Sequence, residues 1–197
     1  AINYDMPVAS AQVKSCLLLA ALYVDGVSTV TEPAVCRNHT ELMLQGFGYP
    51  LEIVGNKVTI RGGASLKACD IDIPADISSA AFFLVGACIA PGSDLTLKHV
   101  GINPTRIGVV NILQAMGANI ELKNETNSFE PTADILVKTS NLKGITLNTK
   151  LVANMIDEMP AFFIAAALAE GTTKVKDAKE LRAKESDRLQ AMAEVLE

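Results

Sequence analysis

The most chemically informative part of the sequence is the charged run ELRAKESDRL, from Glu180 to Leu189. Lys184 and Arg188 lie four residues apart, so both cations can project from one face of a helix. A helix N-terminus also favours anions, through its free N–H groups and its dipole. Glu185 stands between the two cations in the sequence and supplies a group that can move a proton. The run therefore predicts a site for a small, highly anionic substrate whose reaction includes a proton transfer.

A helix must present this run, and the residues that follow have the spacing of one. Leu189, Met192, Ala193 and Leu196 recur at i, i+3, i+4 and i+7, which is the apolar stripe of an amphipathic helix. We expect this helix to span about Ser186–Leu196.

That helix is one element of an internal repeat with the order β-α-β-α-β-β, about 65 to 80 residues long. The first helix of each unit is an apolar run that ends near a glycine suited to a helix C-cap: Gly26, Gly92 and Gly171. The second helix is expected at Asn38–Gly46, Thr105–Met116 and Ser186–Leu196, and the first two of these close with Gly48 and Gly117. Strands are expected at Ile2–Met6, Val27–Thr31, Leu51–Val54, Lys57–Ile60, Cys69–Ile73, Ser93–Val100, Ala118–Asn124, Ala133–Thr139, Ile145–Leu147 and Thr172–Lys176.

The register of the repeat places polar residues at equivalent helix starts. Counting back fourteen residues from each glycine gives Gln12, Ser78 and Asp157 (26−12, 92−78 and 171−157 all equal 14), and each second helix opens beside an arginine: Arg37, Arg106 and Arg188. For Ser78 and Arg106, a structural role as an N-cap and a surface residue stays open beside a role in binding.

Composition indicates a folded protein. The 197 residues are 49% hydrophobic and 20% charged. The net charge of −5 argues against a nucleic-acid or anionic-membrane partner, so a local group of cations must hold any bound anion. The longest apolar stretches, such as residues 16–24 and 161–169, are too short to span a bilayer.

The two histidines, 60 positions apart (99−39), have no metal-ligand spacing, so we expect no metal site. The cysteines are expected to be buried, reduced thiols: Cys16, Cys36, Cys69 and Cys88.

Five motifs, in this order, resemble the EPSP synthase family of 3-phosphoshikimate 1-carboxyvinyltransferases, the target of glyphosate. They are SAQVKS at 10–15, RNHTE at 37–41, NPTR at 103–106, MIDEMP at 155–160 and LRAKESDRL at 181–189. The resemblance runs from Asp5 to Leu196 and implies the α/β enolpyruvyl transferase fold, an inside-out barrel of repeated β-α-β-α-β-β units with about two and a half units present. It further implies that residues 1–75 complete a shikimate-3-phosphate-binding domain and residues 76–197 form part of a phosphoenolpyruvate-side domain. In the family, the two domains close over both ligands.

The resemblance also implies the reaction and the roles of the residues. The family transfers the enolpyruvyl group of phosphoenolpyruvate to the 5-hydroxyl of shikimate 3-phosphate, with no cofactor. By this resemblance, Ser10, Ala11, Gln12 and Arg37 bind shikimate 3-phosphate, although Asn38 departs from the family's usual aspartate. In the same way Asp157 binds the ring hydroxyls and acts as the base, and Glu185 is the acid that protonates the methylene carbon. Lys184 stabilises phosphate and developing charge, and Arg188 holds the phosphoenolpyruvate carboxylate. Arg182, Asp187 and His39 are expected to be structural, and Glu158 to be a charge at a helix start.

The neighbouring cations should lower the pKa of Glu185, which is the wrong direction for an acid, so we expect the acid to form only when substrate anions bind the cations. The family further implies a monomeric cytoplasmic enzyme, and we expect this chain to be an inactive piece that lacks both ends of it. Two alternatives stay open: the sister enzyme that acts on UDP-N-acetylglucosamine, and a non-enzymatic binding module built from the same repeat.

Overall fold

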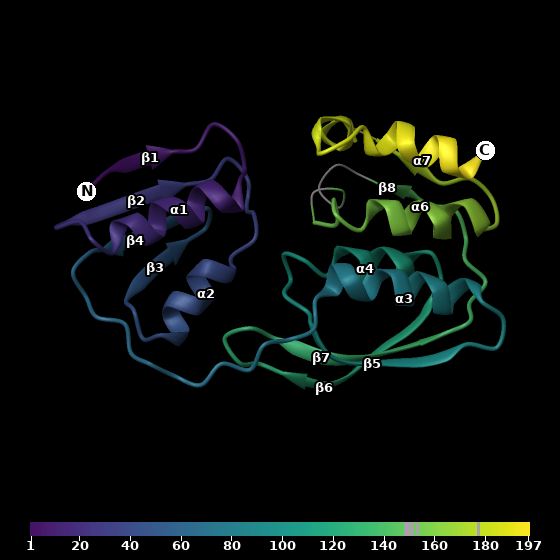
Figure 1. Cartoon of the computed structure of the whole chain (residues 1–197), viewed down its shortest axis with the longest axis horizontal. Helices are drawn as coiled ribbons and strands as arrows, with labels where there is room; N and C mark the ends of the chain where they lie inside the picture. The colour runs from purple at the N-terminus through teal and green to yellow at the C-terminus, as the bar shows by residue number, and fades with distance from the viewer. Residues whose placement is uncertain (148–151, 153, 177) are drawn as a thin grey trace. The chain divides into compact units, whose positions relative to one another are not determined.

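The computed structural model describes residues 1–147, 152, 154–176 and 178–197, and the chain divides into two units, Ala1–Ile73 and Pro74–Glu197. In the first unit the helices α1 (Ala11–Ala21) and α2 (His39–Gly46) pack on one four-stranded sheet (Figure 1). Its strands lie in the order β1 (Asn3–Asp5), β2 (Val27–Thr31), β4 (Lys57–Arg61) and β3 (Leu51–Val54). The pair β1–β2 is parallel and the other pairs are antiparallel. Val30, Val58 and Ile60 alternate with more exposed residues on their strands and meet Leu18 of α1 in the core.

The second unit repeats this topology. Its antiparallel sheet has the order β5 (Asp94–Gly101), β7 (Thr132–Lys138) and β6 (Asn119–Thr126), and the helices α3 (Ile77–Ile89) and α4 (Gly108–Ala115) belong to the same repeat. A parallel bridge from Ala75 to Val100 stands where β1 pairs with β2 in the first unit.

The third repeat follows with β8 (Thr146–Leu147), α6 (Met159–Leu168), β9 (Lys174–Val175), the 3₁₀ helix η1 (Lys179–Ala183) and α7 (Arg188–Leu196). β8 and β9 are again parallel. The repeated β-α-β-α-β-β unit of the predicted fold class is therefore confirmed.

The glycines that close α2 and α4 behave as predicted. Gly48 and Gly117 have φ values of 70° and 93°. The N–H of Gly48 donates to Gln45 O and that of Tyr49 to Leu44 O, and the corresponding bonds follow Gly117. These are the paired bonds of a Schellman motif, which needs a left-handed residue after the helix.

The expected C-caps of the first helices are wrong. Gly26, Gly92 and Gly171 also have positive φ, but the C-cap residues are Leu22, Ala90 and Ala169, so these glycines lie in the turns that follow.

Two other expected boundaries are wrong as well. Residues 69–73 form no strand despite their alternation of polar and apolar residues, because they are exposed and the chain pairs with β5 only at Ala75. The helix α4 begins at Gly108 rather than Thr105, because Asn103 Oδ1 accepts the N–H and hydroxyl of Thr105 and holds that segment in turns.

The cysteines differ from expectation in burial. Cys88 is buried, but Cys16 and Cys69 are exposed. None of the helices in the described part of the chain has the length and apolar character needed to cross a bilayer.

Candidate active site

Three of the predicted site residues meet in the second unit at the start of α7. Arg188 is the first residue of that helix. Its Nη2 donates to Glu185 Oε2 at 2.8 Å, and its Nη1 donates to Asp157 Oδ1 at 3.3 Å and to Ile156 O at 3.1 Å. The guanidinium therefore joins the turn before α6 to the loop before α7, and it brings together two carboxylates that lie 28 positions apart (185−157) in the sequence.

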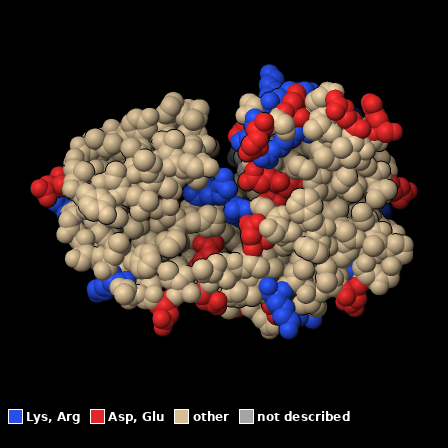
Figure 2. Space-filling view, viewed as in Figure 1, with Lys and Arg blue, Asp and Glu red and all other residues tan. Residues whose placement is uncertain are grey.

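Asp187 fixes the loop that carries this cluster. Its Oδ1 accepts the N–H of Gln190 at 3.0 Å and so caps α7, while its Oδ2 accepts from Arg182 at 2.6 Å. The cap places the helix start at Arg188, so the prediction of a helix from Ser186 is wrong, and Lys184 does not lie in its first turn. Lys184 instead follows η1, and its Nζ lies 2.8 Å from Glu180 Oε1. Figure 2 shows the acidic and basic side chains intermingled over this part of the second unit.

The electrostatics agree with the prediction made for Glu185. The hydrogen bond from Arg188 is the main cause that lowers the pKa of Glu185, and Lys184 adds a smaller contribution. Arg188 in turn has a raised pKa because of its bond to Glu185. Without substrate, Glu185 is therefore an ionised acceptor rather than an acid.

The equivalent residues of the previous repeat form a second cluster in the same unit. Arg106 lies within 3.3 Å of Asp76 Oδ1 and 3.6 Å of Glu158 Oε1, and it also donates to the hydroxyl of Ser78. Ser78 donates to Glu158, which is buried. Ser78 with Arg106 and Asp157 with Arg188 thus make the same contact in two repeats, and each pair occupies positions that the shared register had marked as equivalent. Arg106 is ion-paired inside this cluster, and Glu158, expected to be a simple helix-start charge, contacts neighbouring segments.

Burial has the largest effect on Glu158 and raises the pKa of its carboxyl, while Ser78 and Arg106 act in the opposite direction. This cluster connects the start of α3 with the turn that carries Asp157, since Glu158 is the next residue.

The predicted residues of the first unit lie at two helix starts. Ser10 is the N-cap of α1: its hydroxyl accepts the N–H of Val13 at 3.3 Å and donates to Gln12 Oε1 at 3.4 Å. Ala11 is the first residue of that helix. Arg37 is half-buried and directly precedes Asn38, the N-cap of α2, whose side chain makes no capping bond.

The sequence analysis missed a buried lysine beside these residues. Lys14 lies one turn into α1, is fully buried, and pairs with Glu32 and Glu41. A signal was present, because Lys14 shares the spacing i, i+4 and i+7 with Leu18 and Ala21, the other buried residues of the helix.

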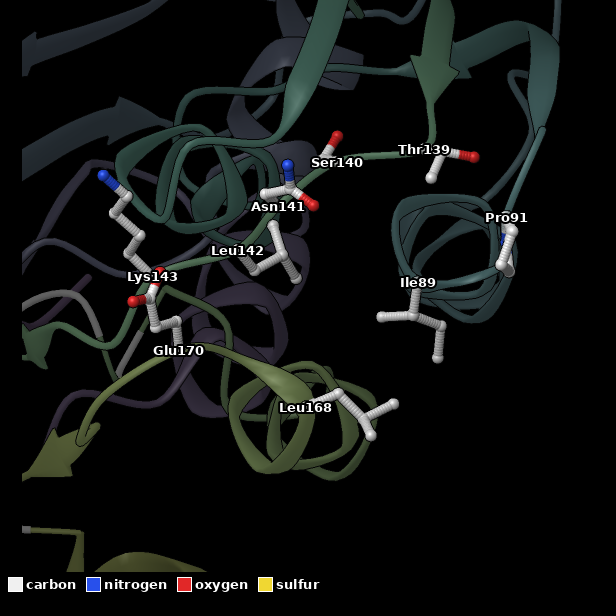
Figure 3. A pocket seen from close by; sticks show the side chains of 9 residues that line it. All are labelled: Ile89, Pro91, Thr139, Ser140, Asn141, Leu142, Lys143, Leu168 and Glu170. Atoms are coloured by element: carbon white, nitrogen blue, oxygen red, sulfur yellow. The ribbon is translucent and has the colours of Figure 1, made fainter.

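A pocket of about 720 Å³ lies elsewhere in the second unit, near the C-terminal ends of α3 and α6. Figure 3 shows Ile89 and Leu168 on one side of it and Asn141, Lys143 and Glu170 on the other. Helix C-termini carry partial negative charge, which disfavours phosphates. The pocket contains no predicted site residue, and it does not suit the anionic substrate that the α7 cluster predicts.

Comparison with known proteins shows the family of the chain. All 197 residues match the family model described as EPSP synthase (3-phosphoshikimate 1-carboxyvinyltransferase). Two relatives with that name, from Alkalilimnicola ehrlichii and Methylococcus capsulatus, are each 59% identical over 99% of this chain, which covers 44% and 45% of their lengths. The chain thus spans less than half the length of the curated relatives that it matches.

Solved structures give the same result for the fold. EPSP synthase from Acinetobacter baumannii superposes on 98% of this chain with a TM-score of 0.93 and 54% identity, and the match covers 44% of that protein. The enolpyruvyl transferase NikO from Streptomyces tendae superposes on 88% of this chain with a TM-score of 0.68, and the match covers 43% of the NikO chain. The sequence identity is 18%, so the similarity is one of fold alone. The family match over every residue, together with these relatives, leads to one conclusion: the chain belongs to the EPSP synthase family.

Proposed function

We propose that the chain is part of an enzyme that transfers the enolpyruvyl group of phosphoenolpyruvate to the 5-hydroxyl of shikimate 3-phosphate and releases phosphate. Membership of the EPSP synthase family supports the reaction. The observation that carries the assignment of residues is the hydrogen-bonded cluster of Asp157, Glu185 and Arg188. It supplies two carboxylates for proton transfer and one guanidinium for a carboxylate ligand.

The reaction moves protons at two atoms, the methylene carbon of phosphoenolpyruvate and the oxygen of the attacking hydroxyl. Addition requires a proton on the methylene carbon of phosphoenolpyruvate and loss of a proton from the attacking hydroxyl, which together give a tetrahedral ketal. Elimination then removes a proton from the new methyl group and expels phosphate. In this proposal Glu185 gives the first proton and takes it back, while Asp157 accepts the proton of the 5-hydroxyl, which passes to the departing phosphate.

Substrate binding would change the protonation of Glu185 through Arg188. In the structure Arg188 donates to Glu185 at 2.8 Å and lowers the pKa of that carboxyl. The phosphoenolpyruvate carboxylate is a bidentate acceptor that competes for the same guanidinium. When it replaces Glu185, the main cause of the lowered pKa disappears, and the added negative charge raises the pKa further. The acid would thus form only in the presence of its substrate.

The remaining assignments concern anion binding. We propose that Lys184 leaves Glu180 to contact the phosphate that is released, and that Ser10, Ala11, Gln12 and Arg37 hold shikimate 3-phosphate. The position of both residues at the N-terminus of α1 supports the assignment of Ser10 and Ala11, because the first N–H groups of a helix can bind an anion.

By the same family resemblance, residues 1–75 belong to the shikimate-3-phosphate domain and residues 76–197 to the phosphoenolpyruvate domain. The cytoplasmic location and the monomeric state also stay predictions.

The acid assignment is tested with Glu185→Gln in the full-length protein that carries this chain. The variant should still bind phosphoenolpyruvate, yet lose exchange of its methylene protons with deuterated solvent and lose at least about 100-fold in kcat. Glu194→Gln is the matched control, because Glu194 lies on α7, the helix that follows Glu185, and its carboxylate accepts from Gln190 alone among the contacts described. Normal methylene exchange in Glu185→Gln would refute the assignment.

The sister reaction on UDP-N-acetylglucosamine is separated by a thermal-shift measurement. Shikimate 3-phosphate should raise the melting temperature of the full-length protein and UDP-N-acetylglucosamine should not. A shift with the nucleotide sugar alone would favour the sister enzyme, and a shift with neither would favour a non-enzymatic module.

A further inference from the structure

Three buried charges in the first unit have no part in the reaction described above. Lys14 Nζ lies 2.9 Å from Glu32 Oε1 and 2.6 Å from Glu41 Oε1, and all three side chains are at least 96% buried. They come from three different segments: α1, the residue after β2, and α2. We call these residues the Lys14 triad.

The triad is a poor device for stability alone. Burying three charges costs desolvation, and well-packed apolar residues in place of a buried ion pair are often as stable. The triad holds one cation and two carboxylates, and Glu41 Oε2 has no hydrogen-bond partner among the residues described. Burial opposes the charge on Lys14, but the bonds to Glu41 and Glu32 outweigh it and raise the pKa of the ammonium. Lys14 is therefore a permanent buried cation.

The triad does connect the two segments assigned to the substrate phosphate. The N–H of Lys14 donates to Ser10 O at 3.0 Å, so Lys14 is joined to the N-cap of α1. Glu32 and Glu41 lie on either side of Arg37 in the sequence. The second oxygen of Glu32 accepts the N–H of Cys36 at 2.9 Å, which fixes the backbone one residue before Arg37.

A second contact couples the same two helices. The hydroxyls of Ser15 and Thr40 lie 2.6 Å apart, next to Lys14 and Glu41 respectively. The start of α1 and the Arg37 segment are thus held in a fixed relative position by the Lys14 triad and by a partly buried hydrogen bond between Ser15 and Thr40. A phosphate monoester that needs helix N–H groups and a guanidinium together requires such a fixed relative position.

We propose that Lys14, Glu32 and Glu41 are positioning residues that fix the N-terminus of α1 against the Arg37 segment, so that both can hold one phosphate monoester. The ligand in this proposal is the shikimate 3-phosphate of the proposed function, and the inference rests on that function. The triad itself does not touch the ligand.

The test replaces the whole triad, because Lys14→Met alone would leave two buried carboxylates without a cation and could prevent folding. The variant Lys14→Met/Glu32→Gln/Glu41→Gln keeps an amide oxygen to accept from Cys36. The control Lys57→Met/Glu52→Gln/Asp25→Asn makes the same change of charge at exposed positions of the same unit.

Calorimetry with the full-length protein should show at least about tenfold weaker binding of shikimate 3-phosphate in the triad variant than in wild type. The control variant should bind it as tightly as wild type does. The KM for phosphoenolpyruvate at saturating shikimate 3-phosphate should stay within about twofold of wild type. Amide hydrogen exchange of residues 10–14 and 36–42 should accelerate at unchanged global stability.

The two proposals fail differently. Unchanged binding and unchanged exchange in a folded triad variant would overturn the positioning role. Faster exchange together with no binding of shikimate 3-phosphate by wild type would overturn the proposed function and support the positioning role. Equal losses for both substrates would indicate general damage and overturn the inference.

Discussion

Gly108 determines how closely α4 approaches the segment before Asp157, and Gly108→Ala measures that contact. A Cβ at position 108 would lie 2.8 Å from the carbonyl oxygen of Asn154, 3.1 Å from its carbonyl carbon and 3.2 Å from Met155 Cβ. Ordinary contacts of this kind need about 3.5 Å, so the segment must move by roughly 0.7 Å. Overpacking of this kind costs about 1–3 kcal/mol, and the helix preference of alanine recovers only a small part of it, because Gly108 is the first residue of α4 and not an interior position.

Urea unfolding of Gly108→Ala should therefore show a loss of about 1–2 kcal/mol in the free energy of unfolding. Since Asn154 lies three positions before Asp157 (157−154), kcat of the full-length protein should also fall. Gly86→Ala is the matched control, because Gly86 lies inside α3 and a Cβ there would meet nothing within 4 Å. It should stabilise by about 0.5–1 kcal/mol. Equal stability of Gly108→Ala and wild type would refute the packing argument.

Two further changes probe the clusters around the site. Burial raises the pKa of Glu158, so the contribution of this carboxyl to stability is present below about pH 4.5 and is lost as the pH rises through the raised value. In urea unfolding, Glu158→Gln should therefore gain stability relative to wild type as the pH rises from 4 to 7. A difference between the two proteins that does not depend on pH would contradict this. Asp187→Ala removes the cap of α7, so thermal unfolding should show a loss of about 1 kcal/mol in stability, and the KM for phosphoenolpyruvate should rise. Asp187→Asn can still cap the helix and should retain most of the stability. Equal losses of stability in both variants would argue against capping.

Much of the fold follows from local patterns in the sequence. Strands β2 and β3 have the predicted limits, and each has a glycine with positive φ directly at one end: Gly26 before β2 and Gly55 after β3. Gly48 and Gly117 were correctly placed, because a left-handed residue after a helix is a local requirement. The repeat also identified Ser78 and Asp157, and Arg106 and Arg188, as equivalent positions, although it did not predict that they pair.

The errors arose where particular side-chain or strand contacts, some local and some distant, decide the structure. Residues 69–73 alternate like a strand, but the sheet edge meets the chain only at Ala75. Asp187 caps α7 one residue before Arg188 and so excludes Lys184 from the helix, a detail that the apolar stripe does not contain. The burial of Lys14 depends on Glu32 and Glu41, which lie 18 and 27 positions away (32−14 and 41−14), and no local pattern predicts that pairing.

The central claim is the enolpyruvyl transfer, and phosphate release tests it most directly. Full-length protein that carries this chain should release phosphate from phosphoenolpyruvate only when shikimate 3-phosphate is present, and Asp157→Asn and Glu185→Gln should each abolish the release. No release by the wild type, or undiminished release by both variants, would contradict the account.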